Sequence, residues 1–342
     1  KNIRNSKLNF HKEFDINYLP RRLGSSPNMK KYIKDKVSGN NVDIIHNHGM
    51  WQMTATYTTL AKKFENIKTI NSPRGTLSPV ALSHSRVKKN AFWLLFQKKS
   101  LEIASAFHAT SEQEYIDIRD LGFRQPIIIL PNGIDIPRLS KEAIKKKRKI
   151  LFLGRINKKK GIENLLYAWK VLMNDFIDWD LEIVGSDEQY GRKSNYLSEL
   201  KQIAIKLKLK NISFSEPIYG EEKFLKYNQS DIMVLPSYSE NFANTVSESL
   251  ASGTPVITTK ATPWKKISDY KCGWYIDTGY EPLLDCLNKA MKISSNNLST
   301  MGHNGREWMT KEYSWDGISE KMILSYKWLH GSSKQYDWII TN

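Results

Sequence analysis

The sequence predicts an α/β protein with two domains, each built on a parallel, doubly wound sheet. Its 342 residues exceed what one ordinary hydrophobic core organises, and they suit two domains. Strand-like apolar runs alternate with helical patterns through most of the chain, which is typical of parallel sheets covered by helices. A polar, basic stretch at 137–149 interrupts this alternation once, as an interdomain linker does.

The first domain is assigned to residues 1–136. Its visible pattern begins with the apolar run VDIIHNH at 42–48, which ends in polar residues. Helices and strands then alternate up to a turn: a helix at 53–64, a strand at 68–73, a helix at 87–104, a strand at 106–111, a helix at 112–121 and a strand at 126–134. The linker is placed at 137–147.

The pattern restarts in a second, more complete domain at 148–312. Apolar runs predict strands at 149–154, 180–185, 211–216, 231–237 and 255–259, and helical spacing predicts helices at 161–174, 195–208, 220–228 and 244–252. A terminal segment at 313–342 contributes a helix near 315–330, which can pack back on the first domain. Ligands of such sheets bind outside the carboxyl ends of the strands, so we expect the two domains to face each other across a cleft.

Composition and charge narrow the function classes. The 52 basic and 35 acidic residues give a net charge of +17, which attracts polyanions, although a lysine-rich genome alone could produce part of it. Nucleic acid is not expected as a partner, because neither a zinc-finger spacing nor an aromatic RNA-binding signature is present. No run approaches the ~20 apolar residues of a membrane-spanning helix. The two cysteines suggest neither a metal site nor a disulfide, so a reducing, cytoplasmic setting is expected.

The first chemical motif is LGRINKKKG at 153–161. A strand ends at Gly154, where glycine allows a tight turn and a close backbone approach, and a helix begins near Gly161. Arg155 and Lys160 would then project toward one point, where a diphosphate leaving group fits a bidentate guanidinium and a point charge. The alternative is a solvated basic loop, which is how we interpret the two lysines between them.

The second motif is PSYSENFANTVSE at 236–248. A buried strand ends at Pro236 and a helix begins near Asn244, whose first backbone N–H groups form an anion site. Glu240 precedes the helix and Glu248 lies one turn inside it. Carboxylates accept hydrogen bonds from hydroxyls, so a sugar or ribose is the expected ligand. Taken separately, each glutamate has an ordinary alternative. Glu240 could simply complement the helix dipole, and Glu248 could simply belong to an exposed face of the helix.

Three of these features together resemble a known family. They are Gly154-Arg155 followed by Lys160-Gly161, two glutamates with seven residues between them, and ASGTPVI at 251–257. The set is similar to retaining glycosyltransferases of family 4, which have the GT-B fold of two Rossmann-like domains. Further matching segments are NSPRGTLSP at 71–79, HATS at 108–111, PNGID at 131–135, and the triplets at 262–264 and 272–274. The SPRG and TPW segments resemble bacterial enzymes that assemble surface polysaccharide, such as the O-antigen of lipopolysaccharide.

The resemblance implies roles for the residues of both motifs. Arg155 and Lys160 would stabilise the departing nucleotide diphosphate, and Glu240 would lie by the donor sugar hydroxyls as the third catalytic residue. The donor-binding set would also include Gly154, Pro217, Ile218, Tyr219, Asn241, Phe242, Ala243, Asn244, Thr245 and Glu248. Within it, Glu248 would bind ribose and 217–219 would flank the base. No cofactor and no metal are expected, because the nucleotide sugar is a substrate and Arg and Lys do the metal's electrostatic work.

The acceptor side is less regular. Many family members carry His at the position of Arg74, where this chain reads SPRG at 72–75. Arg74, His48 and His108 are therefore the acceptor-side candidates, and a buried structural role is the alternative for each histidine. A zinc site at His46 and His48 is not expected, since carboxylate and cysteine partners are absent nearby.

The implied reaction transfers a hexose or N-acetylhexosamine from a nucleotide diphosphate sugar to a glycan or lipid-linked glycan, with retention. Residues 1–40 show no strand followed by a Gly-rich loop, and the chain does not begin with Met. We therefore expect either a missing N-terminal unit or a degenerate first domain. Two alternatives remain: a non-catalytic glycosyltransferase-like partner subunit, and a GT-B nucleotide-sugar epimerase.

The segment RVKKNAFWLLFQKK at 86–99 combines five apolar residues at 92–96 with five cations. A basic, aromatic helix of this kind can lie on an anionic membrane. A core helix with a basic rim is the alternative, because the apolar residues are nearly consecutive. The expectation is a cytoplasmic protein that makes peripheral contact with the inner face of the plasma membrane.

Overall fold

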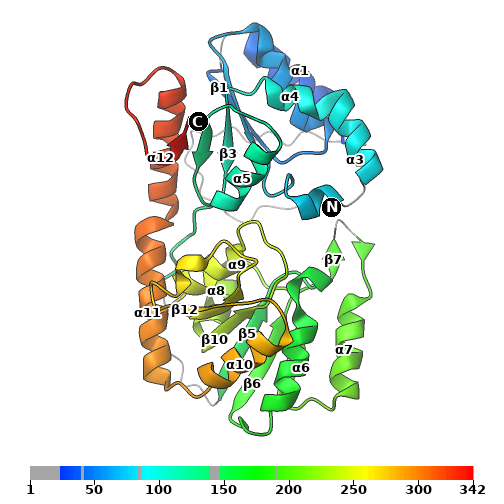
Figure 1. Ribbon diagram of the computed structural model, residues 1–342, viewed down its shortest axis with the longest axis vertical. Helices are drawn as coiled ribbons and strands as arrows, with labels where there is room; N and C mark the ends of the chain where they lie inside the picture. The colour runs from blue at the N-terminus through cyan, green and yellow to red at the C-terminus, as the bar shows by residue number, and fades with distance from the viewer. Residues whose placement is uncertain (1–23, 40–41, 84–85, 139–146, 190–191, 342) are drawn as a thin grey trace.

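The computed structural model describes residues 24–39, 42–83, 86–138, 147–189 and 192–341. Two α/β lobes are stacked along the long axis of the molecule, and a pair of helices runs down one side of both (Figure 1). Each lobe holds a mainly parallel sheet, so the predicted two-domain, doubly wound architecture is confirmed. Most of the predicted linker, residues 139–146, lies outside the described residues, as does the segment before residue 24.

The sheet of the N-terminal lobe has the strand order β1-β2-β3-β4-β13. Its four parallel strands are β1 (Ile44–His48), β2 (Lys68–Ser72), β3 (Ala106–Ala109) and β4 (Ile127–Ile129). The helices of this lobe are α1 (Pro27–Ser38), α2 (Pro79–Ser83), α3 (Arg86–Phe92), α4 (Lys98–Glu102) and α5 (Glu112–Asp120). The predicted helix at 53–64 is a 3-10 helix, η1 (Met53–Lys63), and the predicted helix at 87–104 contains a π-helical turn, η2 (Trp93–Gln97).

The sheet of the C-terminal lobe has the order β12-β11-β10-β5-β6-β9. Its strands are β5 (Arg148–Leu153), β6 (Trp179–Val184), β9 (Ile212–Ser215), β10 (Ile232–Leu235), β11 (Val256–Thr259) and β12 (Gly273–Ile276). Its helices are α6 (Ile162–Leu172), α7 (Tyr196–Lys206), α8 (Gly220–Asn228), α9 (Asn244–Ala251) and α10 (Tyr280–Ala290). Two 3-10 turns, η3 (Lys158–Lys160) and η4 (Lys265–Ile267), and the hairpin β7 (Glu188–Gln189) and β8 (Arg192–Lys193) complete this lobe.

Two long helices connect the lobes. Helix α11 (Ser295–Glu312) packs on the C-terminal lobe, and α12 (Trp315–Leu329) lies against the N-terminal sheet (Figure 1). The expectation that the terminal helix packs back on the first domain is therefore confirmed. The segment after it is more than a tail, since β13 (Ile339–Ile340) pairs antiparallel with β4.

Helix α11 was not predicted, and its packing explains why. Its sequence, SNNLSTMGHNGREWMTKE, is rich in asparagine and glycine, which are weak helix formers. A Cβ on Gly302 would lie 1.9 Å from the carbonyl oxygen of Gly253, so glycine is needed for the helix to approach the segment that follows α9. Tertiary packing thus overrides local propensity here.

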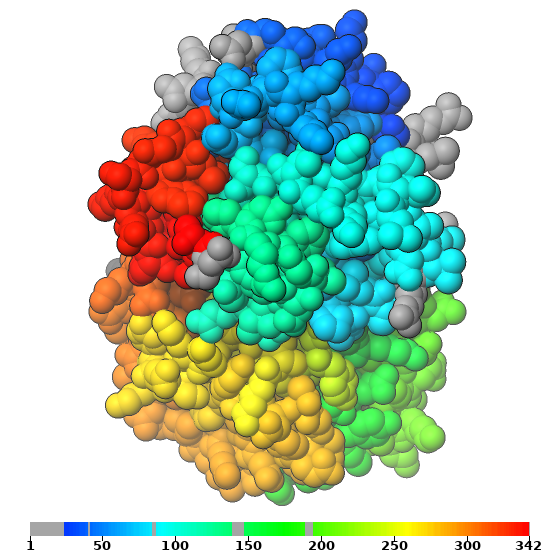
Figure 2. Space-filling model, turned by 45° about the horizontal axis from the view of Figure 1, so that its top comes forward, coloured from blue at the N-terminus to red at the C-terminus, as the bar shows by residue number. Residues whose placement is uncertain are grey.

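Both lobes present the carboxyl ends of their strands to the space between them. A space-filling view shows the lobes in contact at a waist, where residues near 110–135 meet residues near 240–265 (Figure 2). Within the part of the chain that the structure describes, no helix is both long enough and apolar enough to cross a bilayer.

Candidate functional site

A cavity of about 1380 Å³ lies between the lobes. Residues from both lobes line it, among them every predicted donor-side residue: Gly154, Arg155, Lys160, Pro217, Ile218, Tyr219, Glu240, Asn241, Phe242, Ala243, Asn244, Thr245 and Glu248. The cavity is larger than the ~300–1,000 Å³ usual for one small-molecule ligand. It therefore has room for two substrates.

The loop after β5 brings two cations to the cavity. Arg155 is exposed and makes no ion pair with any residue that the structure describes. Lys160 is only 9% exposed, and its ammonium group is paired with the carboxylate of Glu240. The backbone of Gly161 passes so close to β10 that a Cβ there would lie 2.2 Å from the carbonyl oxygen of Pro236. This contact holds the lysine at the strand end.

Two side chains contact the same carboxylate oxygen of Glu240. Oε1 accepts a hydrogen bond of 2.7 Å from the Ser237 hydroxyl in addition to the lysine contact. The backbone N–H of Glu240 donates to the carbonyl oxygen of Ala261 at 3.1 Å. The carboxylate is thereby fixed in the cavity wall, and its partner Lys160 carries a charge that an incoming anion can share.

The N-terminus of α9 is open to the cavity. The residue before the helix, Ala243, has φ of 61°, a left-handed conformation that is strained for a residue with a Cβ, and no side chain caps the helix. Oγ1 of Thr245 is buried and has no hydrogen-bond partner. Uncapped backbone N–H groups and an unpartnered hydroxyl are what a bound anion satisfies.

Glu248 lies one turn farther along α9. Oε1 of its carboxylate accepts from the Lys223 ammonium at 2.7 Å, and Oε2 accepts from the Tyr227 hydroxyl at 3.2 Å. Burial, with the nearby carboxylate, raises the pKa of Tyr227 well above its ordinary value, so its hydroxyl remains a donor. Glu248 is therefore a hydrogen-bond acceptor with a fixed orientation.

Two supports on the C-terminal lobe shape this wall. The indole N–H of Trp264 donates to the carbonyl oxygen of Phe242 at 2.6 Å, and the centroids of the two rings are 5.2 Å apart. On the other side, Tyr219 is 76% exposed at the cavity mouth, at the end of the predicted base-flanking segment 217–219. An exposed ring at that place can stack on a planar ligand.

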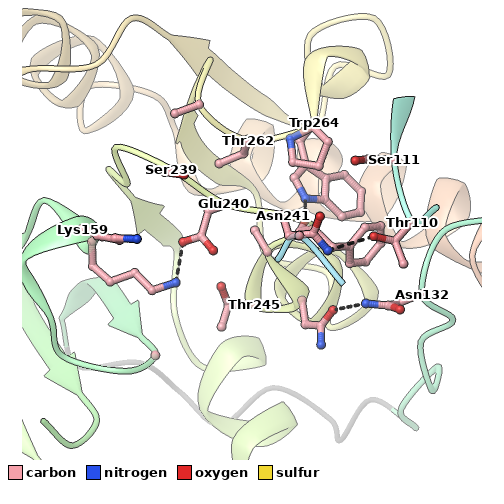
Figure 3. Close-up of a pocket in the computed structure, with 18 of the residues that line it drawn as sticks. Thr110, Ser111, Asn132, Lys159, Ser239, Glu240, Asn241, Thr245, Thr262 and Trp264 are labelled. Carbon is pink, nitrogen blue, oxygen red and sulfur yellow. Dashed lines mark hydrogen bonds and ion pairs between the residues drawn. The ribbon is translucent and has the colours of Figure 1, made fainter. Parts of the chain in front are cut away.

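Hydrogen bonds join the lobes across the cavity. The Asn241 side-chain amide donates to Oγ1 of Thr110 at 2.9 Å, and the Asn132 amide donates to Oδ1 of Asn244 at 3.0 Å (Figure 3). The Asn132 Oδ1 atom also accepts from Arg74. The two lobes are thus in direct hydrogen-bonded contact across the cavity.

Arg74 lines the cavity from the N-terminal lobe. It occupies a left-handed conformation with φ of 58°, in a tight turn, and its second nitrogen donates to Nδ1 of His48 at 2.9 Å. Burial lowers its pKa, and the nearby Glu114 carboxylate raises it. Glu114 itself accepts from the backbone N–H groups of Gly75 and Thr110, at 2.6 and 2.7 Å, and so holds the turn that carries Arg74.

The histidines do not line the cavity. His108 is only 4% exposed, and both its ring nitrogens are hydrogen-bonded, to Ser72 and to the Leu130 carbonyl. Of the two alternatives predicted for His108, the structure places it in the buried position and not in the cavity wall, because strand alternation turns it onto the face covered by α12. His48 is also absent from the cavity wall, but it touches Arg74, and its ring stacks on His46 at 4.2 Å.

Several site residues escaped the sequence analysis. Thr110 and Asn132 lie inside segments that were noted there for their resemblance, so their motifs carried a signal. Lys223 and Tyr227, which hold Glu248, carry no signal, since an exposed-looking lysine on a helix such as α8 is ordinary. Among the described residues, no group of three histidine, cysteine or acidic side chains could hold a metal ion. The prediction of metal independence stays untested.

Comparisons with known proteins place the fold and the family. The model for glycosyl transferases group 1 matches residues 137–308, and the model for glycosyltransferase family 4 matches residues 7–138. The chain is 29% identical over 179 residues to the capsular polysaccharide biosynthesis glycosyltransferase CapM of Staphylococcus aureus, covering 51% of this chain and 44% of that protein. It thus spans less than half the length of that relative.

Two solved structures share the fold. Sucrose-phosphate synthase from Thermosynechococcus elongatus superposes with a TM-score of 0.73 at 21% identity, over 92% of this chain and 81% of that one. HepE of Anabaena, in complex with UDP-glucose, superposes with a TM-score of 0.69 at 18% identity, over 90% and 84% of the two chains. The two lobes share the GT-B architecture of these structures. With its C-terminal lobe matched nearly throughout, the chain belongs to the glycosyl transferases of group 1.

Proposed function

We propose that this protein transfers a hexose or N-acetylhexosamine from a nucleotide diphosphate sugar to a glycan or lipid-linked glycan, with retention of configuration, in surface polysaccharide synthesis. The observation that carries the proposal is that groups which bind anions and carboxylates which accept hydrogen bonds from hydroxyls line one cavity. Lys160, the open α9 N-terminus and Glu248 follow neighbouring parts of one sheet and line the same wall. That order suits a diphosphate flanked by a sugar and a ribose.

The chemistry proposed is stabilisation of a leaving group. As the bond between the sugar and the diphosphate breaks, negative charge grows on the diphosphate, and Arg155, Lys160 and the α9 N-terminus lie where they oppose it. Such cations do the work that a metal ion does elsewhere, so no metal or other cofactor is needed. The acceptor hydroxyl approaches from the side of Arg74 on the N-terminal lobe, the same face that the diphosphate leaves. Its oxygen forms the new bond to the anomeric carbon as the bond to the diphosphate breaks, and its proton passes to the departing diphosphate oxygen.

Glu240 and Glu248 hold the donor rather than exchange protons with it. Each carboxylate is already held by a lysine partner, Lys160 for Glu240 and Lys223 for Glu248. An ionised carboxylate accepts hydrogen bonds from vicinal hydroxyls. In this proposal Glu240 takes those of the sugar and Glu248 those of the ribose.

The relatives guide the choice of substrates to test. CapM is named for capsular polysaccharide biosynthesis, and HepE was solved with UDP-glucose. UDP-glucose is therefore the first donor to test, followed by other UDP-, GDP- and ADP-sugars, in a thermal-shift screen. A donor present at 100 times its dissociation constant stabilises the folded state by about 2.7 kcal/mol.

The test is an acceptor-dependent transfer assay with the donor that the screen selects. Lys160→Ala should lower kcat by roughly 100-fold or more, because one preorganised charge donor is lost. Lys158→Ala is the matched control, since this exposed neighbour in η3 does not line the cavity and should leave kcat unchanged. Glu248→Ala should raise the donor KM. Full activity of the folded Lys160→Ala protein would refute the site.

The same assay separates the two alternatives. An epimerase would convert the donor sugar without any acceptor. A non-catalytic partner subunit would bind the donor in calorimetry and release no nucleotide diphosphate in the presence of acceptor. Retention is read from the anomeric configuration of the product by NMR.

An anionic membrane surface belongs to the proposal as a partner. In α3 and η2 the side chains of Val87, Leu94, Leu95 and Phe96 are 84%, 74%, 69% and 42% exposed, and we name them the apolar patch. Exposed lysines flank it at 88, 98 and 99. Exposed apolar side chains beside clustered cations are typical of segments that lie on anionic bilayers.

The patch lies near the entrance to the cavity. Val80 of α2, the helix before α3, is 44% exposed and also lines the cavity. A protein resting on a membrane through α3 and η2 would therefore bring its cavity close to a lipid-linked acceptor. This arrangement supports a cytoplasmic protein that works at the inner face of the plasma membrane.

Flotation with phosphatidylglycerol-containing liposomes tests the membrane contact. The double variant Leu94→Ser, Leu95→Ser should lose most of its binding, and high salt should weaken binding of the unaltered protein. Ile205→Ser is the matched control, because Ile205 is 68% exposed on α7 of the other lobe. Equal flotation of the two variants would refute the patch, and concentration-dependent self-association lost with Leu94 and Leu95 would assign it to a second copy instead.

A further inference from the structure

A continuous chain of hydrogen bonds crosses the N-terminal lobe beneath the cavity. The Tyr326 hydroxyl of α12 lies 2.8 Å from Nδ1 of His46, and Nε2 of His46 lies 2.7 Å from the Ser72 hydroxyl. Ser72 in turn lies 2.9 Å from Nδ1 of His108, and Nε2 of His108 lies 2.9 Å from the carbonyl oxygen of Leu130. The chain links the C-terminal helix with β1, β2, β3 and the end of β4.

Strand alternation explains why these residues meet. Side chains two positions apart on a strand share a face, so the polar residues lie one step beyond an apolar row on the face that α12 covers. That row consists of Ile44, Ile70, Ala106 and Ile128, which pack with α12 and the C-terminal segment. The polar layer thus separates the apolar core of this face from the cavity edge.

The hydrogen bond to the Leu130 carbonyl, at one end of this hydrogen-bond chain, fixes the donor and the acceptor of every other bond in it. A carbonyl oxygen only accepts, so Nε2 of His108 must carry a proton and donate to Leu130. Burial, aided by the charge of Arg74, lowers the pKa of His108 to about 3, so the ring is neutral at pH 7 and its Nδ1 accepts. The Ser72 hydroxyl must then donate to His108.

The remaining bonds follow in the same way. Having donated to His108, Ser72 accepts from Nε2–H of His46. Burial, and the neighbouring His48, lower the pKa of His46 to about 2, so His46 is neutral and its Nδ1 accepts. Only the Tyr326 hydroxyl is there to donate to it. Burial raises the pKa of Tyr326, which keeps that proton in place.

The hydrogen-bond chain is connected to the cavity wall through the stacked rings of His46 and His48 and the contact of His48 with Arg74. His48 lies on His46 with ring centroids 4.2 Å apart and an interplanar angle of 24°. Arg74 is a donor only, so Nδ1 of His48 accepts its bond, and the proton of the neutral His48 ring is on Nε2. The orientation of the His46 ring therefore determines the orientation of the His48 ring stacked on it, and His48 in turn accepts the hydrogen bond that positions Arg74.

We propose that Tyr326 is a positioning residue, which locks His46 in one tautomer and one orientation and thereby holds His48 and Arg74 at the acceptor side of the cavity. A residue of helix α12, near the end of the described chain, thus helps to hold acceptor-side residues that lie on β1 and in the turn after β2. The kinetic part of this inference rests on the proposed transfer reaction, and the structural part does not.

The structural part is tested by NMR on the full chain with ¹⁵N-labelled histidine. At pH 7, His46, His48 and His108 should each be neutral with the proton on Nε2. In Tyr326→Phe, the Nδ1 resonance of His46 should move, because its donor is lost, and the ring signals of His48 should move with it. A proton on Nδ1 of His46 in the unaltered protein, or unmoved His48 signals in the variant, would overturn the proposal.

Tyr336→Phe is the matched control. Tyr336 packs in the same cluster beneath the sheet and stacks on Trp338, but its hydroxyl bonds to no residue in the described part of the chain. It should leave the signals of His46 and His48 unchanged. This comparison separates loss of the hydrogen bond from loss of packing.

The kinetic part uses UDP-glucose, or the donor that the screen selects, with the acceptor found in the transfer assay. Tyr326→Phe should lower kcat/KM for the acceptor at least about tenfold through misplacement of Arg74, while the donor KM stays the same. A lowered Tm with unchanged acceptor kinetics would reduce Tyr326 to a structural role. If the NMR results hold and no donor is transferred, the proposed function fails while the link from Tyr326 to His48 stands.

Discussion

At the scale of single residues, the two glutamates of the second motif are held by lysines from different places. Lys160 of the loop after β5 pairs with Glu240, and Lys223 of α8 pairs with Glu248. The spacing of the glutamates indicated a site, and their partners show how it is held. Both carboxylates are mostly buried, so each pair costs desolvation that only good geometry offsets.

Thr245 gives a sharp prediction, because its Oγ1 is buried without a partner. Thr245→Val keeps the shape and removes the unsatisfied hydroxyl, so stability without ligand should stay the same or rise by up to about 1 kcal/mol. The thermal shift that the nucleotide sugar produces should shrink. Thr258→Val is the control, since its hydroxyl donates to the Leu235 carbonyl at 3.2 Å and its loss should destabilise. A normal donor-induced shift in Thr245→Val would remove Thr245 from the donor site.

Gly161 gives a second prediction at this scale. Gly161→Ala combines a φ of 66° with a Cβ placed 2.2 Å from a backbone oxygen, so it should cost more than the ~1 kcal/mol of left-handed strain alone. Gly122→Ala is the matched control, because Gly122 has φ of 87° and nothing lies near its Cβ position. Urea denaturation measures both. Equal losses would mean that the backbone of this loop shifts readily.

At the scale of elements, the site follows from where strands end. The segments after β5, β9 and β10 carry the donor-side residues, and the turn after β2 carries Arg74. A helix beginning at such a strand end adds its N-terminal N–H groups, as α9 does. On the N-terminal sheet, the same geometry produces the polar layer of histidines beneath α12.

That layer predicts loss of stability in mild acid. Mainly through burial, the pKa values of His46, His48 and His108 fall to about 2, 4 and 3, whereas an unfolded histidine titrates near 6.5. Between pH 6.5 and 5 the unfolded chain therefore binds protons that the folded chain does not. The free energy of unfolding should therefore be unaffected by these histidines above pH 6.5 and should decrease as the pH falls through this window.

Stability measured at pH 7 and pH 5 checks this expectation. His108→Gln should flatten the dependence by up to about 1.4 kcal/mol per pH unit, since one proton is removed from the linkage. His303→Gln, an exposed residue of α11, is the control and should keep the full slope. A slope that both variants share would assign the acid sensitivity to other groups.

At the scale of the whole molecule, two separate cores are tied together by the last helices. One large cluster fills the C-terminal lobe, and smaller clusters lie on the two faces of the N-terminal sheet. Near the end of the described residues, β13 pairs with β4 of the N-terminal lobe. Segments that lie far apart in the described sequence thus build one lobe.

Unfolding should reflect that division. Phe107→Ala and Phe152→Ala remove fully buried rings from different lobes, and each should cost about 3–5 kcal/mol. We expect calorimetry to resolve two transitions, with a different one lowered in each variant. Ile339→Ala should lower the same transition as Phe107→Ala, despite their separation in sequence. A single transition, lowered alike by all three changes, would show that the lobes unfold as one unit.

Much of the fold and the donor side could be predicted from local pattern. The buried strands β5, β6, β10 and β11 are apolar runs bounded by turn residues, and all were found within one or two positions. Strand β12, absent from the prediction, is half-buried along its whole length and so lacks a clear apolar run. Helix α10 was missed although its buried residues, Leu283, Cys286, Leu287 and Ala290, recur at helical spacing. Lys223 could not be found, because its contact with Glu248 joins residues on two helices whose packing no spacing reveals.

The sequence by itself determined the two parallel sheets, the order of their elements and the strand ends that carry the donor-side residues, because periodicity and glycine placement are local properties. Only the tertiary structure decided which lysine holds which glutamate, that His108 lies beneath α12 rather than in the cavity, and that the last strand completes the first lobe. These outcomes depend on contacts between distant segments, and such contacts are selected by packing and hydrogen-bond satisfaction across the whole molecule.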